Sequence, residues 1–128
     1  MHKNLIRLAS VLMIIGIILG AFGAHFLKAK ISERLIEAYK TGVLYHLLHA
    51  IAILAIGLSN LPNSKNLIRA KNLLLIGITL FSGSLYLLSL KEIVQFPEFL
   101  NFIGILTPIG GISFISGWIF LIRSLNQK

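Results

Sequence analysis

The feature that most constrains this chain is a set of four long stretches without a charged side chain. Each contains between 19 and 24 consecutive residues that lack Asp, Glu, Lys and Arg. The hydrocarbon core of a bilayer is about 30 Å thick, and a helix needs about 20 residues to cross it. The sequence therefore predicts four membrane-spanning helices, over residues 8–27, 41–61, 72–90 and 100–122.

The rest of the chain is too short to hold a soluble domain. Hydrophobic residues make up 56% of the chain and charged residues 12%, whereas soluble proteins carry about 25% charged residues. We therefore expect residues 1–128 to form one domain of the all-α class, an integral membrane four-helix bundle. The net charge of +8 comes from basic residues scattered between apolar runs, which does not indicate nucleic-acid binding. The absence of cysteine excludes disulfides and thiolate metal sites.

The first apolar run also has features of a cleaved signal peptide, because basic residues precede it and small residues lie near its end. The apolar part of a signal peptide has about 7–15 residues, whereas this run extends over residues 8–27. In addition, Gly16, Gly20 and Ala24 recur every four residues and form one line along a helix, where a neighbouring helix can approach closely. We therefore expect the first span to be retained.

The segment between the first two spans, residues 31–40, carries apolar side chains on one helical face and charged side chains on the other. The apolar positions are Ile31, Leu35, Ile36 and Tyr39, and the charged positions are Glu33, Arg34, Glu37 and Lys40. This pattern predicts a short amphipathic helix that lies in the membrane interface, with Ser32 as its N-cap. An exposed loop that is helical is the alternative.

Polar side chains inside apolar spans usually face the bundle interior, and they are the first candidates for a functional site. The candidate cluster consists of His25, Tyr45, His46, His49, Ser82, Ser84, Tyr86 and Thr107. We expect it to form in the half of the bundle away from the chain termini, with His25 and His49 each hydrogen bonded to another span. A second set is predicted to allow close helix packing, namely Gly16, Gly20, Gly23, Gly83, Pro108, Gly110, Gly111 and Gly117. Pro108 is also expected to bend the fourth span.

Three kinds of chemistry can be weighed for this cluster. Neutral imidazoles bind metals and haem, but the spans contain no Asp, Glu or Cys to complete a coordination shell, so we expect no metal and no cofactor. A Ser and His pair across two helices would lack an intramembrane acid to orient the imidazole, so we expect no enzyme. A proton relay remains as an alternative to hydrogen bonds that only fix the helix register.

The basic residues are distributed unequally between the two ends of the predicted bundle. The end with both termini and the second loop holds seven basic residues and no acidic one: Lys3, Arg7, Lys65, Arg69, Lys71, Arg123 and Lys128. The opposite end holds five basic residues and all four acidic ones: Lys28, Lys30, Arg34, Lys40, Lys91, Glu33, Glu37, Glu92 and Glu98. Cytoplasmic loops carry the excess of Lys and Arg, so we expect a multi-pass protein of the cell membrane with both termini in the cytoplasm.

Several short motifs resemble one family of small membrane proteins. They are Gly20-Ala21-Phe22-Gly23-Ala24-His25, Tyr45-His46-Leu47-Leu48-His49-Ala50, Leu80-Phe81-Ser82-Gly83-Ser84-Leu85-Tyr86, Thr107-Pro108-Ile109-Gly110-Gly111 and Gly117-Trp118. In this order they resemble domain of unknown function 423, whose vertebrate relatives are the transmembrane protein 256 group. The resemblance implies four spans and no established activity. That family often has Gln at the position of His46, so the resemblance implies no role that requires an imidazole there.

These observations favour a structural or accessory role in the membrane, in envelope integrity or in modulating a partner. The expected contacts are the lipid bilayer and either a second copy of the chain or another membrane protein, with no nucleic acid. The alternative is a small carrier or channel subunit for protons, metal ions or another solute, which uses the His, Tyr and Ser cluster.

Overall fold

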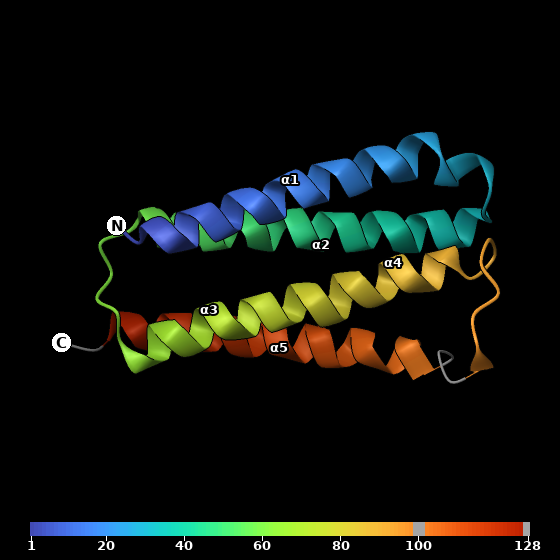
Figure 1. Ribbon diagram of the computed structural model, residues 1–128. Helices are drawn as coiled ribbons and strands as arrows, with labels where there is room; N and C mark the ends of the chain where they lie inside the picture. Colours follow the sequence, from blue (N-terminus) through green and yellow to red (C-terminus); the bar gives the residue numbers. More distant parts are fainter. Residues whose placement is uncertain (99–101, 127–128) are drawn as a thin grey trace.

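The structure is a computed structural model that describes residues 1–98 and 102–126 as a bundle of long helices (Figure 1). In chain order the elements are α1 (Lys3–His25), the 3₁₀ turn η1 (Leu27–Ala29), α2 (Glu33–Leu58), α3 (Lys65–Gly77), the π-helical turn η2 (Ile78–Ser82), α4 (Gly83–Leu90) and α5 (Ile103–Leu125). Because α3, η2 and α4 run into one another, the bundle has four long apolar helices, which confirms the all-α membrane fold. The predicted start of the fourth span, residue 100, lies outside the described residues.

The four crossings run alternately up and down, so the start of α1 and the end of α5 lie at the same end of the bundle (Figure 1). We call this the terminal end, and it also carries the loop between α2 and α3. The opposite end carries the connections from α1 to α2 and from α4 to α5. Helix α1 packs on α2, α3 packs on α5, and α2 joins the two pairs by contacts with η2 and α4.

The segment expected to be a separate interfacial helix is the beginning of α2. One helix runs from Glu33 to Leu58, because no proline interrupts it and its apolar positions continue into the span. Leu35, Ile36 and Tyr39 are buried, so these turns pack into the bundle and do not lie flat on its surface.

Ser32 precedes α2, but its side chain makes no capping hydrogen bond to that helix. Its hydroxyl donates instead to Oε1 of Glu92 over 2.9 Å, and its backbone N–H donates to Oε2 over 2.7 Å. These two hydrogen bonds, with smaller contributions from Lys91 and Arg34, lower the pKa of the Glu92 carboxyl. They link the two connections at the opposite end of the bundle.

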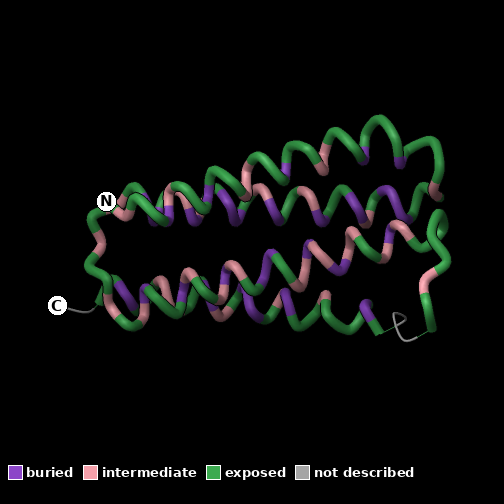
Figure 2. The backbone as a smooth tube through the Cα atoms, viewed as in Figure 1, coloured by how far each residue is buried: buried purple, intermediate pink, exposed green. Residues whose placement is uncertain are grey.

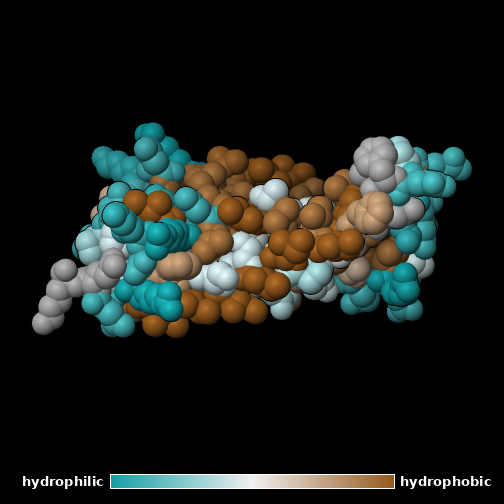
Figure 3. Space-filling view, turned by 90° about the horizontal axis from the view of Figure 1, so that it is seen from below, coloured by the Kyte–Doolittle hydropathy of each residue, from teal (hydrophilic) through white to brown (hydrophobic). Residues whose placement is uncertain are grey.

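The outward faces of the helices are exposed (Figure 2), and large apolar residues occupy most of these positions. On α5 alone, they include six exposed isoleucines: Ile105, Ile109, Ile112, Ile115, Ile119 and Ile122. In the space-filling view an apolar band separates two polar ends (Figure 3). Water would make such a surface a site of aggregation, whereas lipid tails solvate it, so this pattern is that of a protein embedded in a bilayer.

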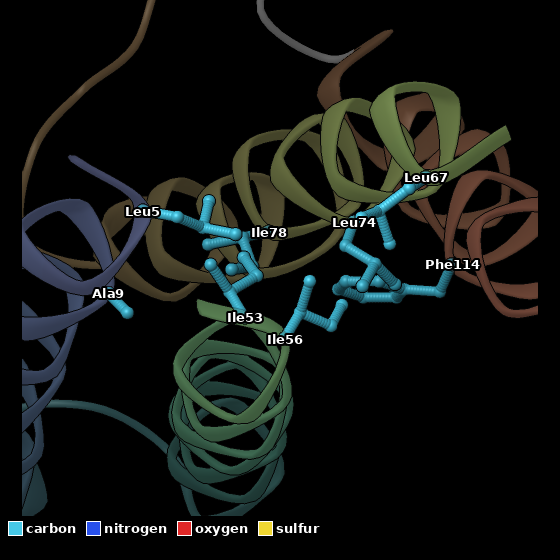
Figure 4. Close-up of a cluster of buried hydrophobic side chains, with 8 residues drawn as sticks. All are labelled: Leu5, Ala9, Ile53, Ile56, Leu67, Leu74, Ile78 and Phe114. Carbon is cyan, nitrogen blue, oxygen red and sulfur yellow. The ribbon is translucent and has the colours of Figure 1, made fainter. Parts of the chain in front are cut away.

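The main core is drawn in Figure 4, and most of its residues belong to the halves of their helices that lie toward the terminal end. It consists of Leu5, Ala9, Ile53, Ile56, Leu67, Leu74, Ile78 and Phe114. A smaller cluster of Leu27, Ile36 and Tyr39 lies toward the opposite end. The polar side chains that carry the candidate chemistry are held between and around these two apolar clusters.

Candidate functional site

His46 is 3% exposed and connects three helices. Its Nε2 atom lies 2.9 Å from the backbone carbonyl oxygen of Leu12 on α1. Its Nδ1 atom lies 3.1 Å from the hydroxyl of Tyr86 on α4. We call this arrangement the His46 junction: His46, the Tyr86 hydroxyl and the Leu12 carbonyl.

The partners of His46 fix its tautomer. A carbonyl oxygen only accepts hydrogen bonds, so Nε2 of His46 carries the proton and donates to Leu12. In the neutral ring Nδ1 is then an acceptor, and the hydroxyl of Tyr86 donates to it. Both nitrogens are therefore used, and a neutral imidazole satisfies the whole junction.

His49 forms a second junction with the fourth crossing. Nε1–H of Trp118 on α5 donates to Nε2 of His49 over 3.2 Å. Nδ1 of His49 lies 2.8 Å from the backbone carbonyl oxygen of Tyr45, so Nδ1 is the protonated nitrogen. The imidazole also stacks on the ring of Phe114, with 3.6 Å between ring centroids. We call His49, the Trp118 indole and the Tyr45 carbonyl the His49 junction.

The two buried histidines do not share a site. A spacing of three residues places them about 60° apart around α2, and the hydrogen bonds of His46 reach α1 and α4 while the indole bond of His49 reaches α5. The expected single cluster is therefore two separate junctions with opposite tautomers.

His25 belongs to neither junction. It is the last residue of α1 and is exposed, and within the described part of the chain no hydrogen bond to its side chain is found. The buried residues of α1 include Ala9, Gly16 and Gly23, which repeat every seven residues. His25 follows Gly23 by two residues, about 200° around the helix, so it faces away from α2. The expectation that His25 bonds to another span is not met.

Among the remaining hydroxyl groups of the candidate cluster, those of Ser84 and Thr107 are the two that connect helices within the described part of the chain. Ser84 on α4 and Thr107 on α5 share a hydrogen bond of 2.6 Å between their hydroxyl oxygens, and Ser84 also donates to the Phe81 carbonyl. Tyr45 makes no such bond among the described residues; its ring packs on Phe81 at 4.6 Å between centroids. Ser82 is fully buried in η2, and its hydroxyl has no partner within residues 1–98 and 102–126.

Comparison with known proteins agrees with this picture of a small membrane bundle. Residues 19–111 match the family described as "Protein of unknown function (DUF423)". The chain belongs to this family. The matched region includes both buried histidines and Tyr86, and it ends before Trp118.

Relatives of this DUF423 protein share most of its length. UPF0382 membrane protein YwdK of Bacillus subtilis is 36% identical over 122 residues, which are 94% of this chain and 94% of that protein. UPF0382 membrane protein SH2409 of Staphylococcus haemolyticus is 40% identical over 105 residues, 82% of this chain and 80% of that protein. A UPF0382 membrane protein of Haemophilus influenzae is 43% identical over 103 residues, 80% and 77% of the two chains. No solved structure matches.

Several residues outside the predicted cluster make equivalent contacts in this DUF423 protein. The hydroxyls of Tyr39, Ser89 and Ser113 donate to backbone carbonyls on neighbouring helices, over 2.7, 3.0 and 2.7 Å. In the sequence, Trp118 stands out only as part of the Gly117-Trp118 motif. A signal for its role was its place directly after Gly117, in a helix that Gly110, Gly111 and Gly117 mark as closely packed.

The predicted packing glycines differ in how closely a neighbouring helix approaches them. A Cβ atom on Gly16, Gly23, Gly110 or Gly117 would lie at 3.2 Å or less from an atom of the facing helix. Gly20 and Gly111 make ordinary contacts, and nothing lies within 4 Å of a Cβ on Gly83. A Cβ atom on Gly57, which no sequence pattern singled out, would lie 3.2 Å from the backbone nitrogen of Ile6. Pro108 lies in the second turn of α5, and helical structure continues through it to Leu125.

The described residues hold no group of three His, Cys, Asp or Glu side chains that could surround a metal ion. What the two junctions provide chemically is a set of neutral hydrogen-bond donors and acceptors. Each one connects α2 to another crossing of the membrane.

Proposed function

We propose that this protein has a structural or accessory role in the membrane, in which the buried histidines hold the helices in register. The observation that carries this proposal is that both ring nitrogens of His46 and of His49 are already used in hydrogen bonds. A metal site needs a ring nitrogen with a free lone pair, and neither junction offers one without being broken. A proton relay needs a partner that passes the imidazole proton on, and the N–H groups of His46 and His49 donate to backbone carbonyls, which only accept.

The energetics suit such a role. A hydrogen bond between helices in a membrane contributes roughly 0.6 kcal/mol on average, with model peptides nearer 1–2 kcal/mol. Each bond alone is weak, but a shifted register would leave buried donors and acceptors without partners. The junctions therefore contribute more to the choice of one packing arrangement than to total stability.

We propose no catalytic activity, because the imidazole partners are a phenol, an indole and two carbonyls, and none is a serine hydroxyl.

A flux measurement tests the proposal against the carrier or channel alternative. Purified protein in liposomes is expected to pass protons and divalent metal ions no faster than protein-free liposomes, after a pH step or a metal gradient. The His49→Phe variant is expected to behave in the same way. A flux above the lipid background that disappears in His49→Phe would contradict the structural role.

We further propose that the protein lies in the cell membrane with its terminal end in the cytoplasm. Within the described residues the terminal end carries no acidic residue and six basic ones: Lys3, Arg7, Lys65, Arg69, Lys71 and Arg123. The acidic residues gather at the opposite end. Partners, whether a second copy or another membrane protein, would contact the exposed apolar faces of the helices.

Cysteine labelling tests this orientation, because the natural chain has no cysteine and gives no background. In intact cells an impermeant thiol reagent is expected to label Glu33→Cys and to leave Lys65→Cys unlabelled. Both positions are exposed, so both should react after the cells are permeabilised. Labelling of Lys65→Cys in intact cells would reverse the proposed orientation.

A further inference from the structure

The terminal end of the bundle contains a groove between two helices whose backbones stand apart. Helices α1 and α3 run parallel and both begin at this end, and among the described residues their backbones make no direct contact. A cavity of about 610 Å³ lies between them. We call it the terminal groove, and its volume is in the range of sites that hold small ligands.

Part of the lining of the terminal groove is polar and positively charged, and we call it the polar wall. Lys3 and Lys71 contribute ammonium groups, and Asn4 and Asn72 contribute side-chain amides. Among the described residues no Asp or Glu lines the groove, and no acidic residue is present in residues 1–32 or 38–91. The groove therefore presents donors and positive charge without a carboxylate to neutralise them.

The other part of the lining consists of leucines, and we call it the apolar wall. Leu8 follows Lys3 by five residues on α1, and Leu75 follows Lys71 by four residues on α3, so each leucine lies about one turn further from the start of its helix than the lysine before it. Leu5 and Leu67 line the groove beside the core. Leu8 is exposed, so an apolar guest would cover a surface that the bundle itself leaves open. The two walls together match a molecule with an anionic head and an apolar tail.

We propose that the terminal groove binds one anionic phospholipid from the adjacent leaflet. Its phosphate lies between Lys3 and Lys71 and accepts hydrogen bonds from the asparagine amides, while an acyl chain lies against Leu8 and Leu75. A phosphate supplies several acceptor oxygens for these donors, and basic pockets between membrane helices are suited to such headgroups. The site does not depend on which side of the membrane the terminal end faces.

Native mass spectrometry of the purified full-length protein tests this proposal. The protein is offered phosphatidylglycerol and phosphatidylcholine with identical acyl chains in equal parts, and phosphatidylglycerol adducts are expected to dominate. Each basic residue near an anionic lipid contributes about a fivefold preference, so K3Q/K71Q is expected to bind phosphatidylglycerol about 25-fold more weakly. The charge-conserving variant K3R/K71R is expected to keep the preference, which separates loss of charge from loss of fold.

A matched control removes the same charge from the opposite end. K28Q/K30Q is expected to bind phosphatidylglycerol like the unmodified protein. Inorganic phosphate and glycerol phosphate, at the lipid's concentration, are expected not to displace phosphatidylglycerol, because they cannot cover the apolar wall. Equal binding of the two lipids, an unchanged preference in K3Q/K71Q, an equal loss in K28Q/K30Q, or displacement by free phosphate would each overturn the proposal.

Discussion

Replacing Gly110 with alanine is expected to destabilise the bundle by about 2 kcal/mol or more, within the range measured for overpacked interiors. Gly110 on α5 faces the π-helical turn η2, where a Cβ would lie 2.8 Å from the Cα of Phe81. The obstacle is backbone and cannot rotate away, so α5 and η2 would have to move apart. The free energy of unfolding, measured by detergent titration in mixed micelles with helical circular dichroism, gives the loss.

Gly83→Ala is the matched control, because Gly83 immediately follows η2 and nothing lies within 4 Å of a Cβ placed there. Alanine is favoured over glycine inside a helix by about 1 kcal/mol. The Gly83 variant is therefore expected to be as stable as the unmodified protein or slightly more stable. Equal losses in both variants would contradict a close contact at Gly110.

Replacing His46 with leucine is expected to lower the free energy of unfolding by about 1–3 kcal/mol, because the Tyr86 hydroxyl loses its acceptor in a buried place. His46→Gln is expected to stay within about 1 kcal/mol of the unmodified protein, since an amide can donate to the Leu12 carbonyl and accept from Tyr86. The same detergent titration measures both variants.

A double-mutant cycle with Tyr86→Phe isolates the bond itself. If the hydroxyl donates to His46, the loss in the double variant H46L/Y86F is expected to be smaller than the sum of the two single losses, by about 0.6 kcal/mol or more. Additive losses would show that the two side chains do not interact.

The sequence was sufficient to predict the spans and most of the interior polar groups. Runs of apolar residues long enough to cross a bilayer leave few alternatives to a helical bundle. His46, His49, Ser84 and Thr107 were identified correctly as side chains that contact other helices, because a polar group in a lipid-facing position is costly.

The arrangement of these groups could not be predicted in the same way. The line of Gly16, Gly20 and Ala24 leaves the contact face of α1 toward its end, because Gly16 is buried and Gly20 meets Val43 but Ala24 is exposed. The buried face continues through Gly23 instead. This shift turned His25 outward. A residue at the end of a span can meet water and headgroups, so its polarity does not require an interior partner.

The π-helical turn at Ile78–Ser82 was also outside the reach of sequence patterns. Adding one residue to a helical turn rotates everything beyond it by about 100°, but the residues on both sides are so uniformly apolar that the pattern hardly changes. Here the turn coincides with the close approach of Gly110 to Phe81 and leaves the hydroxyl of Ser82 buried without a partner among the described residues.

Nitrogen-15 NMR of histidine-labelled protein in bilayers is the most direct test of the central claim that both buried imidazoles are neutral links between helices. The shifts of protonated and unprotonated ring nitrogens are well separated, so the tautomer of each ring can be measured. The structure predicts a proton on Nε2 of His46 and on Nδ1 of His49, each as a single tautomer. An imidazolium, a reversed tautomer or exchange between tautomers at either position would contradict it.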